Sequence, residues 1–219
     1  VTNQLRVKQA GDYLVAFTLP MTSDSSANNE RTTIRAELVV NGVTHEMGLS
    51  ESSFIRGYNF HQQGSDHFAV LVPNVAAEST IAVKVSGTSH SGPVLTSDTA
   101  SLYVEYIETA RTVFAAKATA NAAGNLQPAT ESPMVRDSAD RNDTGYTFSA
   151  GCTNLTLDTA GSDLVFVNIP LQGDGTDRQS PKLQVRLDGA LVPGGEAMQG
   201  YLRPNSEGND RSSIHWSGL

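Results

Sequence analysis

The sequence contains a single cysteine, Cys152, so no disulfide can form within the chain. We interpret Cys152 as a small apolar residue at the start of a strand. Long apolar runs are also missing, and no segment approaches the roughly 18 consecutive apolar residues that a membrane-spanning helix needs. Insertion into a membrane is therefore not expected.

Positive charge is scarce. Lys and Arg together number 15, against 23 Asp and Glu, which gives a formal net charge of -8. Proteins that bind nucleic acid need clustered Lys and Arg to neutralise phosphates, and this chain has no such cluster. Nucleic acid is therefore not expected as a partner. Thr, Ser, Asn, Gly and Ala are abundant while Lys is rare, a composition that favours an extracellular or cell-surface location.

Motifs of catalysis are missing as well. The five histidines are scattered, without the H-x-H or H-x-x-x-H spacing of a zinc site. There is no G-x-S-x-G nucleophile elbow, and no glycine-rich loop opens a helix to hold phosphate. We therefore expect a protein that is not an enzyme and has no organic cofactor.

Alternation of apolar and polar residues is what the sequence has in abundance. It runs through "DYLVAFTLP" from Asp12 to Pro20, and it recurs in "TIRAELVV", "HFAVLV", "IAVKV", "LYVEY" and "LQVRL". A period of two predicts strands, and the intervening Gly, Pro, Asn, Asp and Ser residues predict loops. The best candidate for a helix, residues 115–123, has no apolar stripe. An all-β sandwich or barrel is the predicted fold.

Two hairpin turns are predicted by their chemistry. Asn41-Gly42 and Asp188-Gly189 each follow an alternating segment. Asn, Asp and Gly tolerate the positive φ that a type I′ turn requires at both central positions. We expect a two-residue turn at each pair.

The sequence also contains an internal repeat. The segment Asn3–Pro20 resembles Thr153–Pro170 at an offset of 150 positions (170 minus 20). The landmarks that follow keep an offset of 147: Arg31 and Arg178, Asn41-Gly42 and Asp188-Gly189, and Arg56 and Arg203. His67 and His215 follow at 148. Landmarks in the same order at nearly constant spacing indicate two copies of one unit.

The two copies are expected to be incomplete in complementary ways. Copy one spans residues 1–109 and lacks the N-terminal strands that precede the matching segment of copy two. Copy two spans residues 110–219 and lacks a counterpart to residues 72–107, the C-terminal strands of copy one. The complete unit is therefore expected to have about 150 residues, an estimate that follows from the repeat offset. We expect the missing strands to come from a longer array or from a neighbouring molecule.

Several segments resemble the jelly-roll domains of the C1q/TNF family. "AGDYLVAFTLP" is similar to the central strand of that family, through Gly11, Tyr13 and Phe17. "RAELVVNGV" resembles its Asn-Gly hairpin, and "SLYVEYI" its closing strand. The lead-in of copy two, with Phe114 and Gly145-Tyr146, resembles its opening strands. The resemblance covers most of both copies and implies two jelly-roll β-sandwiches, a fold whose members form trimers.

Two sets of polar residues are candidate sites. Asp137, Asp140 and Asp143 place three carboxylates within seven residues, a pattern that suits calcium, although such loops are also common solvated connections. Arg31, Arg178, Arg56 and Arg203 recur at equivalent positions, where they could bind carboxylates or pair with acidic residues at the ends of the sheet. Recurrence favours the structural role, and the same argument applies to His67 and His215.

The preferred functional hypothesis is an extracellular structural or adhesive repeat protein. Such a protein would assemble into a surface array or filament by self-association, with strand exchange between neighbouring units to satisfy open sheet edges. The alternative is a C1q/TNF-like module that forms trimers and binds carbohydrate or a receptor. Aromatic side chains could line a sugar-binding face or fill the core: Tyr13, Phe54, Tyr58, Phe60, Tyr201 and Trp216.

Overall fold

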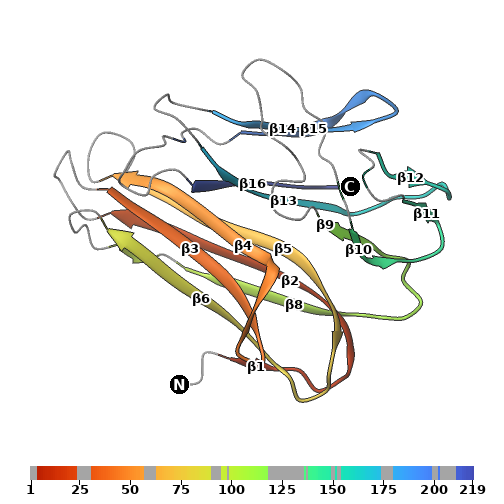
Figure 1. Ribbon diagram of the computed structural model, residues 1–219, viewed down its shortest axis with the longest axis horizontal. Helices are drawn as coiled ribbons and strands as arrows, with labels where there is room; N and C mark the ends of the chain where they lie inside the picture. The colour runs from red at the N-terminus through yellow and green to blue at the C-terminus, as the bar shows by residue number, and fades with distance from the viewer. Residues whose placement is uncertain are drawn as a thin grey trace.

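In the computed structural model the chain is built of antiparallel β-strands (Figure 1). The structure describes residues 4–23, 31–56, 63–89, 95–97, 99–117, 136, 138–148, 151, 154–173, 180–198, 202 and 211–219. These residues contain strands and no helix, so the all-β prediction is confirmed. Accordingly, nothing in the described part of the chain is a helix with the length and apolar character needed to cross a membrane.

The N-terminal group of strands, β1–β8, forms two antiparallel sheets. Its members are β1 (Leu5–Arg6), β2 (Gly11–Ser23), β3 (Arg31–Val40), β4 (Val43–Arg56), β5 (Gln63–Val75), β6 (Thr80–Ser89), β7 (Leu95–Ser97) and β8 (Ser101–Ile107). One sheet has the order β1-β6-β3-β4. In the other, β2 is central, with β5 along one edge and β7 and β8 along the opposite edge. Both central strands, β2 and β3, therefore have neighbours on both sides.

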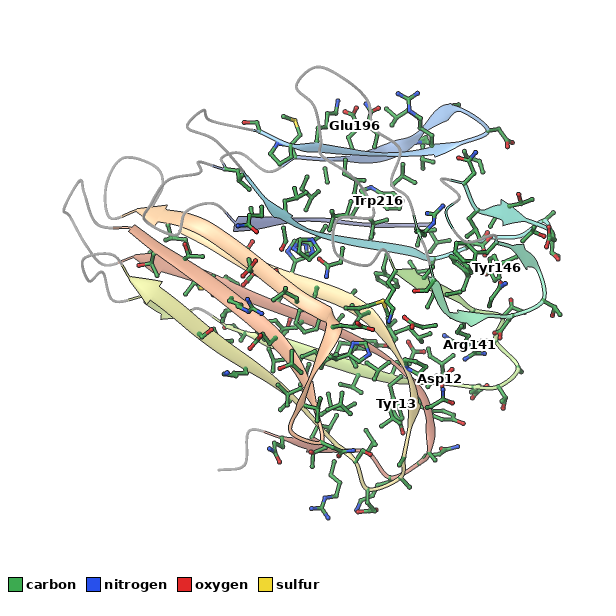
Figure 2. The ribbon with its side chains drawn as sticks, viewed as in Figure 1. Asp12, Tyr13, Arg141, Tyr146, Glu196 and Trp216 are labelled. Carbon is green, nitrogen blue, oxygen red and sulfur yellow. The ribbon has the colours of Figure 1, made fainter. Side chains whose placement is uncertain are left out.

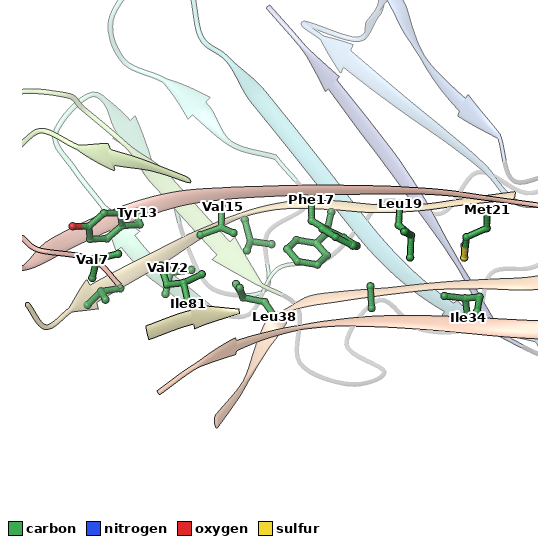
Figure 3. Close-up of a cluster of buried hydrophobic side chains, with 14 of the residues drawn as sticks. Val7, Tyr13, Val15, Phe17, Leu19, Met21, Ile34, Leu38, Val72 and Ile81 are labelled. Carbon is green, nitrogen blue, oxygen red and sulfur yellow. The ribbon is translucent and has the colours of Figure 1, made fainter. Parts of the chain in front are cut away.

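The two sheets of the N-terminal group share one hydrophobic core (Figure 3). Alternation along β2 turns every second side chain inward, and these are met by apolar side chains from the opposite sheet. Val15 of β2 and Leu38 of β3 are fully buried, and the rings of Phe17 and Phe68 lie 5.6 Å apart. Truncating a buried side chain of this kind, as in Leu38→Ala, costs about 2–5 kcal/mol. The arrangement is that of a β-sandwich.

The C-terminal group of strands, β9–β16, forms four two-stranded pairs. Its members are β9 (Phe114–Lys117), β10 (Ser138–Asn142), β11 (Tyr146–Thr147), β12 (Thr156–Leu157), β13 (Val165–Gln172), β14 (Lys182–Leu187), β15 (Ala190–Met198) and β16 (Arg211–Gly218). The described pairs are β9 with β10, β11 with β12, β13 with β16, and β14 with β15. The β13–β16 pair lies between the N-terminal group and the β14–β15 pair (Figure 1).

Two strand pairs of the C-terminal group have the same register as two pairs of the N-terminal group. In β2–β5, Phe17 lies opposite Phe68. In β13–β16, Val167 lies opposite Trp216, at offsets of 150 (167 minus 17) and 148 (216 minus 68). The residue pairs on either side follow the same offsets along the whole length of β13.

The β3–β4 and β14–β15 hairpins correspond in the same way. Val39 lies opposite Thr44 in the first hairpin, and Arg186 lies opposite Leu191 in the second. Both strands are thus related by an offset of 147. Even the register shift recurs, after Glu37 in the first hairpin and after Gln184 in the second. The offsets that relate segments of the sequence thus also relate strand pairings, which are non-local contacts.

Each hairpin closes through a two-residue turn at the positions that the sequence indicated. Asn41 and Gly42 have φ of 50° and 82°, and Asp188 and Gly189 have φ of 50° and 80°. Positive φ at both central positions matches the right-handed twist of the flanking strands. Asn41 adds a tertiary contact, because its side-chain oxygen accepts a hydrogen bond of 2.8 Å from the Thr80 amide of β6.

Candidate assembly surface

The open edges of β13 and β14 are the first notable surface. In the N-terminal group, β2 is paired with β5 and β8, and β3 is paired with β4 and β6. Within the described residues, β13 is paired with β16 alone and β14 with β15 alone. One backbone edge of each strand therefore has no strand beside it in that part of the structure. An unpaired row of N–H and C=O groups is a template for another strand.

Apolar side chains beside these edges are exposed. Val165 is 37% exposed and Phe166 is 36% exposed, whereas Val15, the β2 counterpart of Val165, is fully buried. Leu187, at the end of β14, is 57% exposed. In the N-terminal group, β8 lies beside Val15 and Ala16, and β6 lies beside Val40. The C-terminal group thus presents an apolar surface along its open edges.

A polar junction joins β13–β16 to the N-terminal group. β4 is the edge strand of its sheet, and its backbone edge is met by side chains instead of a strand. The Asn168 amide donates hydrogen bonds to the Met47 and Leu49 carbonyls, at 3.2 and 3.0 Å. The hydroxyl of Ser213 accepts a hydrogen bond of 2.9 Å from the Glu51 amide. These contacts pair three backbone groups on this edge of β4 and thereby hinder strand addition at Met47–Glu51.

Ser50 lies at the centre of the junction. Its hydroxyl contacts the Asp66 carboxyl of β5 and lies 3.2 Å from His215 Nε2 of β16. The hydroxyl has one proton, so it can be the donor in only one of these contacts. If Ser50 donates to Asp66, His215 Nε2–H donates to Ser50. If Ser50 donates to His215, the protonated Asp66 carboxyl donates to Ser50. Either arrangement satisfies both contacts with no positive charge on the imidazole.

The ionisable groups of the junction have shifted pKa values. Burial raises the pKa of Asp66 from 3.8 to about 7, partly offset by the hydrogen bond from Ser50. Burial also lowers the pKa of His215 from 6.5 to about 3, with a further contribution from the adjacent His67. The pKa of His67 is lowered by burial as well. Near neutral pH, the two imidazoles are therefore uncharged and Asp66 is partly protonated.

Three atoms of the residues named in this junction are buried without a hydrogen-bond partner among the described residues. They are Asp66 Oδ2, His215 Nδ1 and Asn168 Oδ1. Asp66 faces the sandwich core, where the C-terminal group has Ile214 at the equivalent position. A polar side chain at a core position costs stability unless it is fully paired. The junction therefore specifies how the two groups of strands meet at some expense of stability.

The order of side chains in the junction differs from a hydrolytic triad. In such a triad a histidine lies between the carboxylate and the serine. Here Ser50 lies between Asp66 and His215, and Ser50 is fully buried. The cluster is arranged to hold strands of the two groups together.

A second contact between the groups is made by Arg141 of β10. Its guanidinium forms an ion pair with Asp12 of β2 (Figure 2). It forms another, at 2.6 Å, with Asp143. Arg141 also donates a hydrogen bond of 3.1 Å to the Arg111 carbonyl. Arg141 lowers the pKa of Asp143. One guanidinium thus connects β10, β2 and the segment after β8.

Two of the three carboxylates predicted as a calcium site are engaged by cations. Asp143 forms an ion pair with Arg141, and the Asp140 carboxylate lies 3.4 Å from the Nζ atom of Lys117. Asp137 lies outside the described residues. Within the described residues, no three His, Cys, Asp or Glu side chains are grouped as a metal site would require. The calcium hypothesis stays a prediction.

The recurring arginines are only partly described. The backbones of Arg31 and Arg56 are directly opposite each other at the ends of β3 and β4. Arg178 and Arg203 lie outside the described residues. Of the aromatic residues, Tyr13 belongs to the core, and Trp216 donates a hydrogen bond of 2.8 Å to the Gly194 carbonyl of β15 (Figure 2). Cys152, too, is outside the described part.

Sequence reasoning singled out His67 and His215 but missed their partners. Ser50, Asp66 and Asn168 were not identified. One signal was available for Asp66, because it occupies the same face of its strand as Phe68 and Val70. A carboxyl group in an apolar row is unusual and indicates a buried polar contact.

No protein-family model and no curated protein sequence matches this chain.

Proposed function

We propose that this protein is an extracellular structural or adhesive protein that assembles into a surface array or filament. In this proposal the two groups of strands are two jelly-roll units of a tandem repeat. Self-association provides the contacts between molecules, and strand exchange between neighbouring units covers the open edges of β13 and β14. A tandem array of this kind needs no catalytic centre, because its function is mechanical.

The observation that carries the proposal is the equal register of β2–β5 with β13–β16 and of β3–β4 with β14–β15. Matching pairings in the same chain order support two copies of one unit. The strand orders β1-β6-β3-β4 and β5-β2-β8 support a jelly roll. The exposed Val165 and Leu187 support assembly, since apolar surface along an open strand edge promotes association.

The test is to follow the size of the intact 219-residue chain as its concentration is raised. Sedimentation velocity and negative-stain electron microscopy should reveal species that grow with concentration. Because each 219-residue chain carries a formal net charge of -8, added salt should screen the repulsion between chains and promote assembly. A chain that stays monomeric at all concentrations and salt levels would contradict the proposal.

A second candidate function is a C1q/TNF-like module that forms a closed trimer and binds carbohydrate or a receptor. The observation in its favour is the contact between His67 and His215, which are equivalent positions of the two proposed units. The junction also sets the face of β13–β16, through Asn168 and Ser213, against the edge of β4. Such a heterologous contact can repeat around an axis and close into a ring.

The two candidates differ in the size distribution that each predicts. A closed trimer has a mass of three times 23.2 kDa that stays constant over a range of concentrations. A filament grows without a fixed upper size. Light scattering after gel filtration distinguishes them, and glycan-array binding by a fixed-size species would favour the module.

A further inference from the structure

The N-terminal group provides a template for what covers the open edges of the C-terminal group. On β2, Val15 lies opposite Val104 of β8, and Phe17 lies opposite Leu102. At the offset of 150, Val15 corresponds to Val165 of β13, and Phe17 corresponds to Val167. Residues 165–168 of β13 therefore correspond to residues 15–18 of β2, which lie beside β8.

The edge of β14 has a corresponding template in β6. Val40 of β3 lies opposite Ile81, which is fully buried, and Leu38 lies opposite Val83. At the offset of 147, Val40 corresponds to Leu187 of β14, and Leu38 corresponds to Val185. With no β6-like strand beside it in the described residues, Leu187 is 57% exposed.

We propose that the open edges of β13 and β14 are docking sites for two antiparallel strands with the pattern of β8 and β6, supplied by a neighbouring unit. The β8-like strand pairs with β13, with its Val104-type residue opposite Val165. The β6-like strand pairs with β14, with its Ile81-type residue opposite Leu187. This inference rests on the proposed function, since it names the partner that strand exchange supplies. Main-chain hydrogen bonds provide affinity, and alternate apolar side chains select the register.

Two synthetic peptides test the inference against the intact chain. One has the sequence of residues 99–109, TASLYVEYIET, and the other that of residues 79–87, STIAVKVSG. Each is labelled, and its binding is measured by fluorescence anisotropy. A photo-crosslinker in place of Val104 should attach the first peptide to β13 near Val165. The Val104→Lys peptide is the matched control and should not bind.

Variants of the chain serve as controls for each other. Val165→Lys should weaken binding of the β8 peptide by about tenfold or more, because it sets a charge against an apolar strand. It should leave the β6 peptide unaffected. Leu187→Lys should weaken binding of the β6 peptide and leave binding of the β8 peptide unaffected. Val43→Lys, at an exposed position beside the first hairpin turn, should change the binding of neither peptide. A variant that fails to fold would lose both peptides, which separates misfolding from loss of one edge.

The outcomes distinguish this inference from the proposed function. If the peptides bind at the expected register while the intact chain never assembles, the docking sites stand and the assembly proposal fails. If the chain assembles while neither peptide binds or crosslinks to β13 or β14, the inference is overturned and assembly proceeds through another surface. Equal binding to wild type, Val165→Lys and Leu187→Lys would also overturn it.

Discussion

The imidazole rings of His67 and His215 pack against each other with centroids 3.7 Å apart and an interplanar angle of 47°. One ring belongs to β5 and the other to β16, so the pair lies across the junction between the two groups of strands. Two neutral rings tolerate this distance, but a proton on either one introduces a charge into a buried site. The junction should therefore respond to pH.

The first prediction concerns His215. Its pKa is lowered from 6.5 to about 3 in the folded chain, so the unfolded chain binds the additional proton in this interval. The stability that neutral His215 contributes is present above pH 6.5 and is lost as pH falls toward 3. The slope is about 1.4 kcal/mol per pH unit for one proton. His215→Gln should flatten this loss, as measured by urea unfolding between pH 7 and pH 4.

A double-mutant cycle with His67→Gln provides the control for this prediction. Because His67 contributes to the lowered pKa of His215, the two substitutions should be non-additive, increasingly so below pH 6.5. Parallel stability curves for wild type and His215→Gln across this range would contradict the prediction.

The second prediction concerns Asp66, whose pKa is raised from 3.8 to about 7 by burial. A raised pKa means that the folded chain holds a proton which the unfolded chain releases above pH 3.8. The corresponding stability is present below pH 3.8 and is lost as pH rises through about 7. Asp66→Asn cannot titrate, so the variant should gain stability relative to wild type as pH increases from 4 to 7.

Ser50→Ala is the matched variant for Asp66. The Ser50 hydroxyl lowers the pKa of Asp66. Removing the hydroxyl should therefore raise this pKa, so that the loss of stability with rising pH continues above pH 7. The measurement is the same series of urea unfolding curves. An Asp66→Asn curve that stays parallel to wild type would show that Asp66 does not titrate in this range.

The third prediction concerns Asn168, which donates to two carbonyls on the edge of β4. Asn168→Ala leaves both carbonyls without this donor and should destabilise the chain by about 1–3 kcal/mol. Asn168→Asp should be worse, because a carboxylate cannot donate and would face two carbonyl oxygens. Asn142→Ala, at an exposed position of β10, should change stability by about 0.5 kcal/mol or less.

Hydrogen exchange at the Glu51 amide adds local evidence on Asn168. This amide donates to Ser213 within the same junction, so it should exchange faster in Asn168→Ala. Unchanged exchange together with unchanged stability would mean that Asn168 does not hold β13 against β4.

The fourth prediction compares the two hairpin turns. Gly42 and Gly189 have φ of 82° and 80°, and an added Cβ would have no atom within 4 Å at either position. Substitution by Ala therefore costs backbone strain alone, about 1–2 kcal/mol. Gly42→Ala and Gly189→Ala should destabilise their hairpins by similar amounts, as measured by hydrogen exchange across each turn. If the two substitutions destabilise their hairpins by amounts that differ severalfold, the two hairpins are not equivalent.

The sequence by itself determined the all-β class, the main alternating strands and the two-residue turns. These properties are local, because a period of two and a pair of residues with positive φ are written in consecutive positions. Asn41-Gly42 and Asp188-Gly189 could be identified for this reason. The offsets of 147 to 150 were also visible, although their meaning for strand pairing was not.

Only the tertiary structure decided which surfaces meet. Ser50, Asp66 and His215 are separated by 16 and 149 positions (66 minus 50, 215 minus 66), and no local rule brings them together. The contact between Asn168 and the edge of β4 depends on how two sheets are placed in space, which is a balance of many weak non-local interactions. The exposure of Val165 beside the burial of Val15 has the same origin. Their strands alternate alike, but Val15 packs in the core between two sheets while Val165 is partly exposed, so packing between sheets determines which side chain is covered.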